Sequence, residues 1–180
     1  MIIIEKIQRL ILESQTIEKV IKVNGLNYRT ACKIFCIDKN KNILCEIHKP
    51  PGVTQLPGGA LDIGENHIQA AKRELMEEAG WIAKNFKLIN YTKTFHLKNN
   101  TAQEWFGKDG WSGEVYSAVK CKAVEYKPDH TFGIEGDSGK FEFIPIREFV
   151  KLIKLSKPKY DRIKFRNEFL LEVINGGFLN

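Results

Sequence analysis

Gly59-Ala60-Leu61-Asp62-Ile63-Gly64-Glu65 begins the most informative stretch of this chain. After seven further residues the stretch continues with Arg73-Glu74-Leu75-Met76-Glu77-Glu78-Ala79-Gly80-Trp81. A glycine-rich loop opens it, and residues 65–79 then contain no Pro or Gly and are rich in helix formers. An apolar stripe recurs at helical spacing along this segment, at Ile68, Ala71, Leu75 and Ala79. Gly80 stands where a helix end favours a left-handed residue. We therefore predict a helix over residues 65–79.

Three glutamates crowd one face of this predicted helix. Glu74, Glu77 and Glu78 stand at positions i, i+3 and i+4, which share a face. Like charges at this spacing destabilise a helix by about 0.2–0.5 kcal/mol per pair, and Arg73 offsets part of this by pairing with Glu77. A bound cation relieves the repulsion, and hard oxygen ligands suit Mg²⁺ or Mn²⁺ together with substrate phosphates. A solvated acidic helix face is the alternative.

The spacing of the whole stretch resembles that of one known family. The pattern Gly-x5-Glu-x7-Arg-Glu-Leu-x-Glu-Glu-x-Gly fills every fixed position of the Nudix box, so the chain is similar to the Nudix hydrolases. Trp81 departs from the pattern, because the family usually has an aliphatic residue at this packing position. The resemblance implies an α+β fold, an α/β/α sandwich with a mixed β-sheet between helices. It covers about residues 28–155 of a single domain over residues 1–180.

The resemblance also implies a reaction and roles for the box residues. Nudix enzymes cleave a nucleoside diphosphate linked to another moiety, and a metal-bound water attacks phosphorus. By resemblance the three glutamates bind the metal ion, and Glu77 or Glu74 also orients or deprotonates the water. The backbone at Gly59 bends close to a metal ion or phosphate, Arg73 braces the glutamates by salt bridges, and Glu65 holds the loop–helix junction together.

Four further residues complete the predicted site. Gly58, like Gly59, lets backbone N–H groups approach oxyanions that a Cβ would block, although a plain tight turn explains these glycines too. Glu135 matches a loop acid that reaches the metal in MutT-like proteins, and an ordinary turn is its alternative. Trp105 and Trp111 lie among Gly and polar residues, where they stack on a base or simply pack into the core.

Composition and cysteine usage favour one globular domain in the cytoplasm. The chain has 180 residues, of which 43% are hydrophobic and 28% charged. It has no uninterrupted apolar run of about 18 residues, so we expect no membrane span. Glu5 and Lys6 interrupt the apolar start, which argues against a signal peptide. The four cysteines match no zinc-binding spacing and are expected to be buried free thiols: Cys32, Cys36, Cys45 and Cys121.

The net charge of +6 is partly carried by the C-terminal tail. A basic surface steers nucleotides toward a site and can also grip RNA, although no RNA-recognition signature is present. An ordinary lysine-rich surface is the preferred interpretation. The basic residues of the tail are Lys151, Lys154, Lys157, Lys159, Arg162, Lys164 and Arg166.

Helices and strands are predicted along the rest of the chain from apolar periodicity and turn residues. The terminal additions, about the first 25 and last 20 residues, are interpreted as a homodimer surface or a lid. Strands are predicted at 19–23, 28–38, 43–48, 87–97, 113–125 and 141–144, and further helices at 2–14, 146–155 and 160–174.

The leading interpretation is a Mg²⁺-dependent pyrophosphohydrolase acting on a nucleoside triphosphate or related nucleotide. Three others stay open: a 5′-end RNA pyrophosphohydrolase or decapping enzyme, an ADP-ribose or nucleotide-sugar hydrolase, and a non-catalytic nucleotide-binding module. The proline typical of ADP-ribose hydrolases is absent from Thr94–Leu97, and the tyrosine typical of diadenosine polyphosphate hydrolases is absent from Leu97–Asn99. The intact glutamates argue against a binding module.

Overall fold

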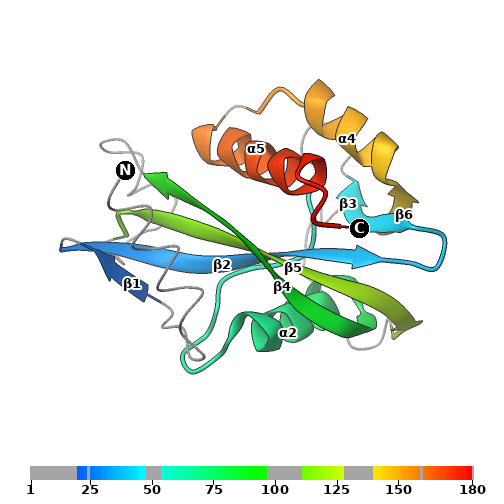
Figure 1. Ribbon diagram of the computed structural model, residues 1–180, viewed down its shortest axis with the longest axis horizontal. Coiled ribbons are helices and arrows are strands. Elements are labelled where there is room, and N and C mark those ends of the chain that lie inside the picture. Colours follow the sequence, from blue (N-terminus) through cyan, green and yellow to red (C-terminus); the bar gives the residue numbers. More distant parts are fainter. Residues whose placement is uncertain are drawn as a thin grey trace.

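The computed structural model describes residues 20–23, 25–47, 54–96, 111–127, 140–158 and 160–179. Within them a six-stranded sheet has the order β4-β5-β2-β3-β6, with β1 paired to β2. Helix α2 lies on one side of the sheet, and α4 and α5 lie on the other (Figure 1). The strands are β1 (Val20–Val23), β2 (Leu26–Ile37), β3 (Asn42–Ile47), β4 (Trp81–His96), β5 (Gly113–Tyr126) and β6 (Lys140–Pro145), and the helices are α2 (His67–Ala79), α4 (Ile146–Leu155) and α5 (Asp161–Asn175).

The sheet is mixed, as predicted. Strands β2 and β5 run parallel over Tyr28–Ile37, whereas the other strand pairs are antiparallel. Helices on both sides of this sheet confirm the α+β fold. None of the helices within the described ranges is long and apolar enough to cross a membrane.

Strand β2 separates two hydrophobic cores. Its alternate residues Cys32, Ile34 and Cys36 join the core beneath α2, whereas Ala31 and Phe35 join the core beneath α4 and α5. All four cysteines are buried and free, which confirms their prediction as packing residues. The same alternation places Lys33 on the face of Ala31 and Phe35.

The loop before α2 is hydrogen-bonded into the sheet. Strands β2 and β3 pair only at Ile37 and Ile43, and the loop runs along β2 beyond that point. The N–H of Cys32 donates to the carbonyl of Gly59 at 2.9 Å, and the N–H of Ile34 donates to Pro57 at 2.9 Å. The glycines of the box are therefore held against the middle of β2, directly before the helix that carries the glutamates.

Most predicted elements are present. Three predictions need correction: the first residue of α2, the first residue of β4 and the exposure of the basic tail. Helix α2 starts at His67 rather than at residue 65, because the side chain of Asn66 caps it. Strand β4 starts at Trp81 rather than at residue 87, directly after the helix. Trp81 packs against Tyr126 and Phe143, with ring centroids 5.2 and 4.9 Å apart, which confirms it as a packing residue. The predicted helix over 2–14 lies outside the described residues.

The basic tail is the third correction, because part of it faces inward. Arg166 is only 7% exposed, and Arg162 pairs with the buried carboxylate of Glu114. Helix α5 covers the second core with Phe169, Leu170 and Val173, so its arginines lie beside that core. The tail is therefore less of a basic surface than its composition predicts.

Candidate functional site

Local hydrogen bonds fix both ends of helix α2. At its start the side chain of Asn66 accepts from the backbone N–H groups of Ile68 and Gln69, and Gln69 returns a bond to the N–H of Asn66. At its end Gly80 adopts the left-handed conformation, with φ 65°, and donates to Met76 at 3.0 Å. The helix therefore presents its glutamates in a fixed register relative to the glycine loop.

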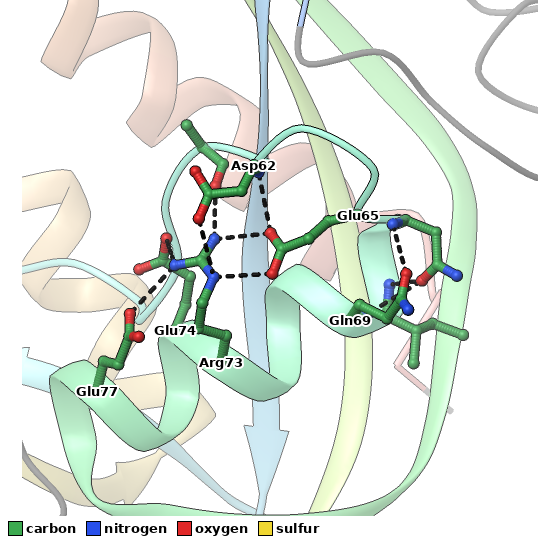
Figure 2. A network of polar contacts seen from close by, with 9 residues as sticks. Asp62, Glu65, Gln69, Arg73, Glu74 and Glu77 are labelled. Atoms are coloured by element: carbon green, nitrogen blue, oxygen red, sulfur yellow. Dashed lines mark hydrogen bonds and ion pairs between the residues drawn. The ribbon is translucent and has the colours of Figure 1, made fainter.

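Arg73 is the hub of the acidic cluster. Its guanidinium binds both oxygens of Glu65 at 2.8 Å, and Nη1 also donates to Glu74 at 2.9 Å and Glu77 at 3.1 Å. Figure 2 shows this guanidinium between Glu65 on one side and Glu74 and Glu77 on the other. The predicted pairing with Glu77 is confirmed, and the charge of Arg73 offsets the repulsion between the acids.

Glu65 ties the loop to the helix, as the resemblance implies. Its carboxylate accepts from the backbone N–H of Asp62 at 2.9 Å as well as from Arg73. The hydrogen bonds from Arg73 lower the pKa of Glu65 below its ordinary value, so the carboxylate stays ionised in the folded protein. Nη2 of Arg73 also donates to the carbonyl of Ala60 at 3.0 Å, which fixes the same junction a second time.

The carboxylate of Glu74 fills the space that Gly59 leaves open. A Cβ built on Gly59 would meet the carboxylate of Glu74, so a side chain at this position would require Glu74 to move. The glycine therefore allows this carboxylate to approach the loop backbone closely. The Gly59 carbonyl accepts from Cys32, which leaves one of its two lone pairs for a further partner.

Glu78 is bound by the neighbouring glycine of the loop, Gly58. The backbone N–H of Gly58 donates to Oε2 of Glu78 at 2.7 Å, so this N–H is already engaged rather than open to a phosphate. The carbonyl of the same glycine accepts from Nζ of Lys33 at 2.6 Å. Burial raises the pKa of Glu78 above its ordinary value, and the positive charge of Lys33 opposes that rise.

The residues present suit a divalent cation, although they do not yet converge on one point. Among the described residues, no three acidic, histidine or cysteine side chains come close enough to hold an ion by themselves. Arg73 holds Glu74 and Glu77, while Gly58 holds Glu78. The donors are nonetheless hard oxygens on one helix face beside a glycine loop without Cβ atoms, which is the ligand chemistry of Mg²⁺ and Mn²⁺.

Three other predicted site residues have different outcomes. Glu135 and Trp105 lie outside the described residues. Trp111 lies directly before β5 and is half-buried, beside Ser112, whose N–H donates to Asn27 at 2.7 Å. Base stacking by Trp111 stays a prediction.

Sequence reasoning missed the cationic residues beside the glycine loop. Lys33 occupies a strand that otherwise reads as buried, and Arg166 lies in a helix whose basic residues suggest a surface. A charged residue within an apolar strand was the one available signal for Lys33. No signal in the sequence brings Arg166 to the same region.

Comparison with known proteins decides the family. The NUDIX domain family matches residues 27–164, which is most of the chain and includes α2 and the glycine loop. The chain belongs to the NUDIX domain family. The matched residues of this Nudix protein include all of α2 and the loop before it.

The Nudix chain is also similar to characterised relatives over part of its length. It is 33% identical over 84 residues to an 8-oxo-dGTP diphosphatase of Escherichia coli, covering 41% of this chain and 65% of the relative. It is 41% identical over 84 residues to an 8-oxo-dGTP diphosphatase of Haemophilus influenzae, covering 41% of this chain and 62% of the relative. The matched stretches thus span less than two thirds of these relatives.

Solved structures share the fold of the Nudix chain. A NUDIX hydrolase from Nitrosomonas europaea superposes with a TM-score of 0.57 at 16% identity, covering 83% of this chain and 90% of the other. The dihydroneopterin triphosphate pyrophosphohydrolase of E. coli superposes with a TM-score of 0.52 at 15% identity, covering 81% and 95%. At these identities the likeness shows the fold alone.

Proposed function

We propose that this protein is a divalent-metal-dependent pyrophosphohydrolase that cleaves a nucleoside diphosphate linked to another moiety, foremost a nucleoside triphosphate. The observation that carries the proposal is the arrangement of Glu74, Glu77 and Glu78 on one helix face, with Glu74 against Gly59 and Glu78 bound by Gly58. Family membership and the partial match to 8-oxo-dGTP diphosphatases support the same reaction.

The proposed cofactor is Mg²⁺ or Mn²⁺, held by the carboxylates of Glu74, Glu77 and Glu78, with the Gly59 carbonyl and Glu135 as further candidate ligands. When bound, such an ion neutralises phosphate charge and lowers the pKa of an attacking water. Phosphate binding by the backbone of Gly58 and Gly59 stays a prediction, because Glu78 accepts from the N–H of Gly58 and the carboxylate of Glu74 occupies the space beside Gly59.

Each protein group has a separate task in the proposed reaction. Glu77 is the most exposed of the glutamates bound by Arg73, with 37% of its side chain accessible, so it can meet a water molecule at the surface. We assign it to orient or deprotonate the water, with Glu74 as the alternative base. Arg73 holds both carboxylates in position and is a positioning residue rather than a catalytic one.

A nucleotide panel tests the proposal directly. The purified protein is incubated with Mg²⁺ or Mn²⁺ and each substrate, and the released phosphate or pyrophosphate is measured. The panel contains ordinary nucleoside triphosphates, 8-oxo-dGTP, ADP-ribose, a nucleotide sugar and a 5′-triphosphorylated RNA. Turnover of the triphosphates that disappears with a chelator supports the proposal. Nucleotide binding without turnover of any member overturns it in favour of a binding module.

An RNA substrate receives less support from the structure than from the sequence. In the basic tail that motivated it, Arg166 is buried and Arg162 is half-buried and paired with Glu114. RNA binding, a homodimer and a cytoplasmic location stay predictions. Activity on RNA that rises with its length and falls steeply with salt would favour the RNA interpretation.

A further inference from the structure

Two buried cations lie beside the glutamate site and are not used by it. Lys33 on β2 is 8% exposed, and Arg166 on α5 is 7% exposed. Burial lowers the pKa of Lys33, and the positive charge of Arg166 is the next cause. Lys33 donates to Gly58 and Arg166 donates to Gln55, so both side chains bind the loop before α2, although they are far apart in the sequence.

Both cations bind neutral oxygens only. Nζ of Lys33 donates to the carbonyl of Gly58 at 2.6 Å. The guanidinium of Arg166 donates to the amide oxygens of Gln55 at 2.8 Å and Asn167 at 3.3 Å. Its buried Nε has no hydrogen-bond partner among the described residues. Neither cation forms an ion pair within 4.0 Å with any carboxylate in the part of the chain that the structure describes.

The acids nearest to these cations already have other partners. Arg162 binds both oxygens of Glu114, at 2.9 and 3.1 Å. The side-chain amide of Gln55 donates to Glu46, so Gln55 separates that acid from Arg166. The remaining carboxylate, Glu78, accepts from the N–H of Gly58 and faces the glutamate site.

A buried charge without a counter-ion is strongly unfavourable. Transfer of an isolated ionised group to the protein interior costs several kcal/mol even after relaxation, on the order of the whole stability of a small domain. Two repelling cations in one region raise this cost further. An anion that contacts both removes the repulsion and supplies acceptors for donors that now bind weakly or not at all.

We propose that Lys33 and Arg166 form an anion site that binds the phosphate chain of the substrate next to the glutamate site. This inference rests on the proposed function for the nature of the anion. The two buried cations assign a substrate class with charged phosphates on this side of the loop, such as a nucleoside triphosphate, rather than an uncharged leaving group.

Gly58 couples the anion site to the glutamate site. Its carbonyl binds Lys33 and its N–H binds Glu78, so a single peptide residue lies between the ammonium and the carboxylate. A divalent ion bound to Glu78 would neutralise the negative charge that now partly compensates the charge of Lys33. Metal binding and phosphate binding are therefore expected to reinforce each other, as linked equilibria do.

The test measures binding of inorganic pyrophosphate to the full chain by calorimetry, with and without Mg²⁺. Lys33→Met and Arg166→Met should each weaken pyrophosphate binding about tenfold to a hundredfold, as expected for loss of a charge-assisted hydrogen bond. Lys122→Met is the matched control, because it removes the same charge from an exposed site on neighbouring β5. Lys33→Arg should recover part of the affinity, whereas a purely steric role of the side chain predicts no recovery.

Cooperative thermal unfolding shows whether each variant is folded. If neither Met variant folds, the wild-type protein still provides the test through acetylation of its lysines followed by mass spectrometry. Pyrophosphate with Mg²⁺ should then protect Lys33 and leave Lys122 unprotected. Equal labelling of Lys33 with and without pyrophosphate would overturn the anion site.

Hydrolysis of the nucleotide panel by the same samples separates the two proposals. Turnover by the wild type, together with pyrophosphate affinities of the folded Lys33→Met and Arg166→Met variants within twofold of wild type, overturns the anion site and leaves the proposed function intact. Binding that depends on Lys33 without turnover of any nucleotide supports the anion site and overturns the proposed function.

Discussion

Arg73 and Lys33 are cations on two sides of the same glycine loop, and their surroundings are opposite. Arg73 is half-buried and lies within 3.4 Å of four carboxylates, those of Asp62, Glu65, Glu74 and Glu77. Lys33 is buried and binds one backbone carbonyl. One side of the loop therefore has more negative charge than its cation can neutralise, and the other has positive charge with neutral acceptors.

This difference indicates what each side is built to receive. The acidic side becomes more stable when a cation enters it, and the basic side when an anion enters it. A metal ion with a phosphate chain satisfies both at once, with the loop between them. Substitutions on one side at a time therefore test the acidic and the basic side separately.

The largest effect is expected from Glu77→Gln on the acidic side. Loss of the proposed base should lower kcat by about 10²–10⁴-fold, the usual contribution of general acid–base catalysis. The amide can still accept from Arg73, so the fold should be retained. Steady-state kinetics on the best nucleotide of the panel provide the measurement, and wild-type kinetics in a folded variant would contradict the assignment of Glu77.

Arg73→Met should have the next largest effect, on stability. It removes hydrogen bonds to Glu65, Glu74 and Glu77 and should lower the free energy of unfolding by about 2–3 kcal/mol. Urea unfolding measures the loss, and added Mg²⁺ should recover part of it by neutralising the released acids. Lys140→Met is the control, because its ion pair with Glu142 is exposed and should contribute little. A variant as stable as wild type would show that the hydrogen bonds of Arg73 to the glutamates do not stabilise the fold.

A smaller effect is expected from Gly59→Ala. The added Cβ meets the carboxylate of Glu74, so the side chain must move and metal affinity should fall by about tenfold. Gly25→Ala is the comparison for metal affinity: its Cβ meets no neighbour within 4 Å, and the strain from the left-handed backbone of Gly25, φ 78°, acts on stability rather than on Glu74. Titration with Mn²⁺ should therefore separate the two variants. Equal metal affinity in both variants would show that the close approach of Glu74 to Gly59 does not contribute to metal binding.

The smallest effects concern the pH dependence of the free energy of unfolding, to which Glu65 and Glu78 contribute with opposite signs. Arg73 lowers the pKa of Glu65, so Glu65 stabilises the fold above its unfolded value of 4.5, and this contribution is lost as the pH falls below it. Burial raises the pKa of Glu78, so its contribution is present at low pH and lost as the pH rises through the folded value.

Two variants read out these signs without metal. Compared with wild type, Glu65→Gln should lose less stability between pH 5 and about pH 3, whereas Glu78→Gln should be more stable at pH 7. Urea midpoints at a series of pH values provide the measurement. Shifts of the same sign in both variants would contradict the opposite pKa shifts of Glu65 and Glu78.

Local patterns predicted most of the fold. Helix α4 has the predicted bounds because Pro145 stops β6 and the apolar residues that follow keep helical spacing. Strand β4 was predicted six residues too short at its start. Its pairing with β5 shifts register at three places, and Asn85 has a positive φ of 57°, so the alternation of polar and apolar residues is broken there.

The acidic side of the site was predictable and the basic side was not. Glu74, Glu77 and Glu78 lie within one helical turn and a half, so spacing alone places them together. The capping pair Asn66 and Gln69 was also a readable signal for the start of α2. Lys33 and Arg166 reach the same loop only because α5 packs back onto the sheet, and no local pattern encodes the proximity of residues so far apart in sequence.

The central claim is that the acidic face of α2 holds the divalent ion, and Mn²⁺ binding followed by electron paramagnetic resonance tests it most directly. The wild-type protein should bind Mn²⁺ in competition with Mg²⁺, and Glu74→Gln and Glu78→Gln should each weaken binding by at least about tenfold. Mn²⁺ that stays free in the presence of wild-type protein, or that binds both variants with unchanged affinity, would contradict the claim.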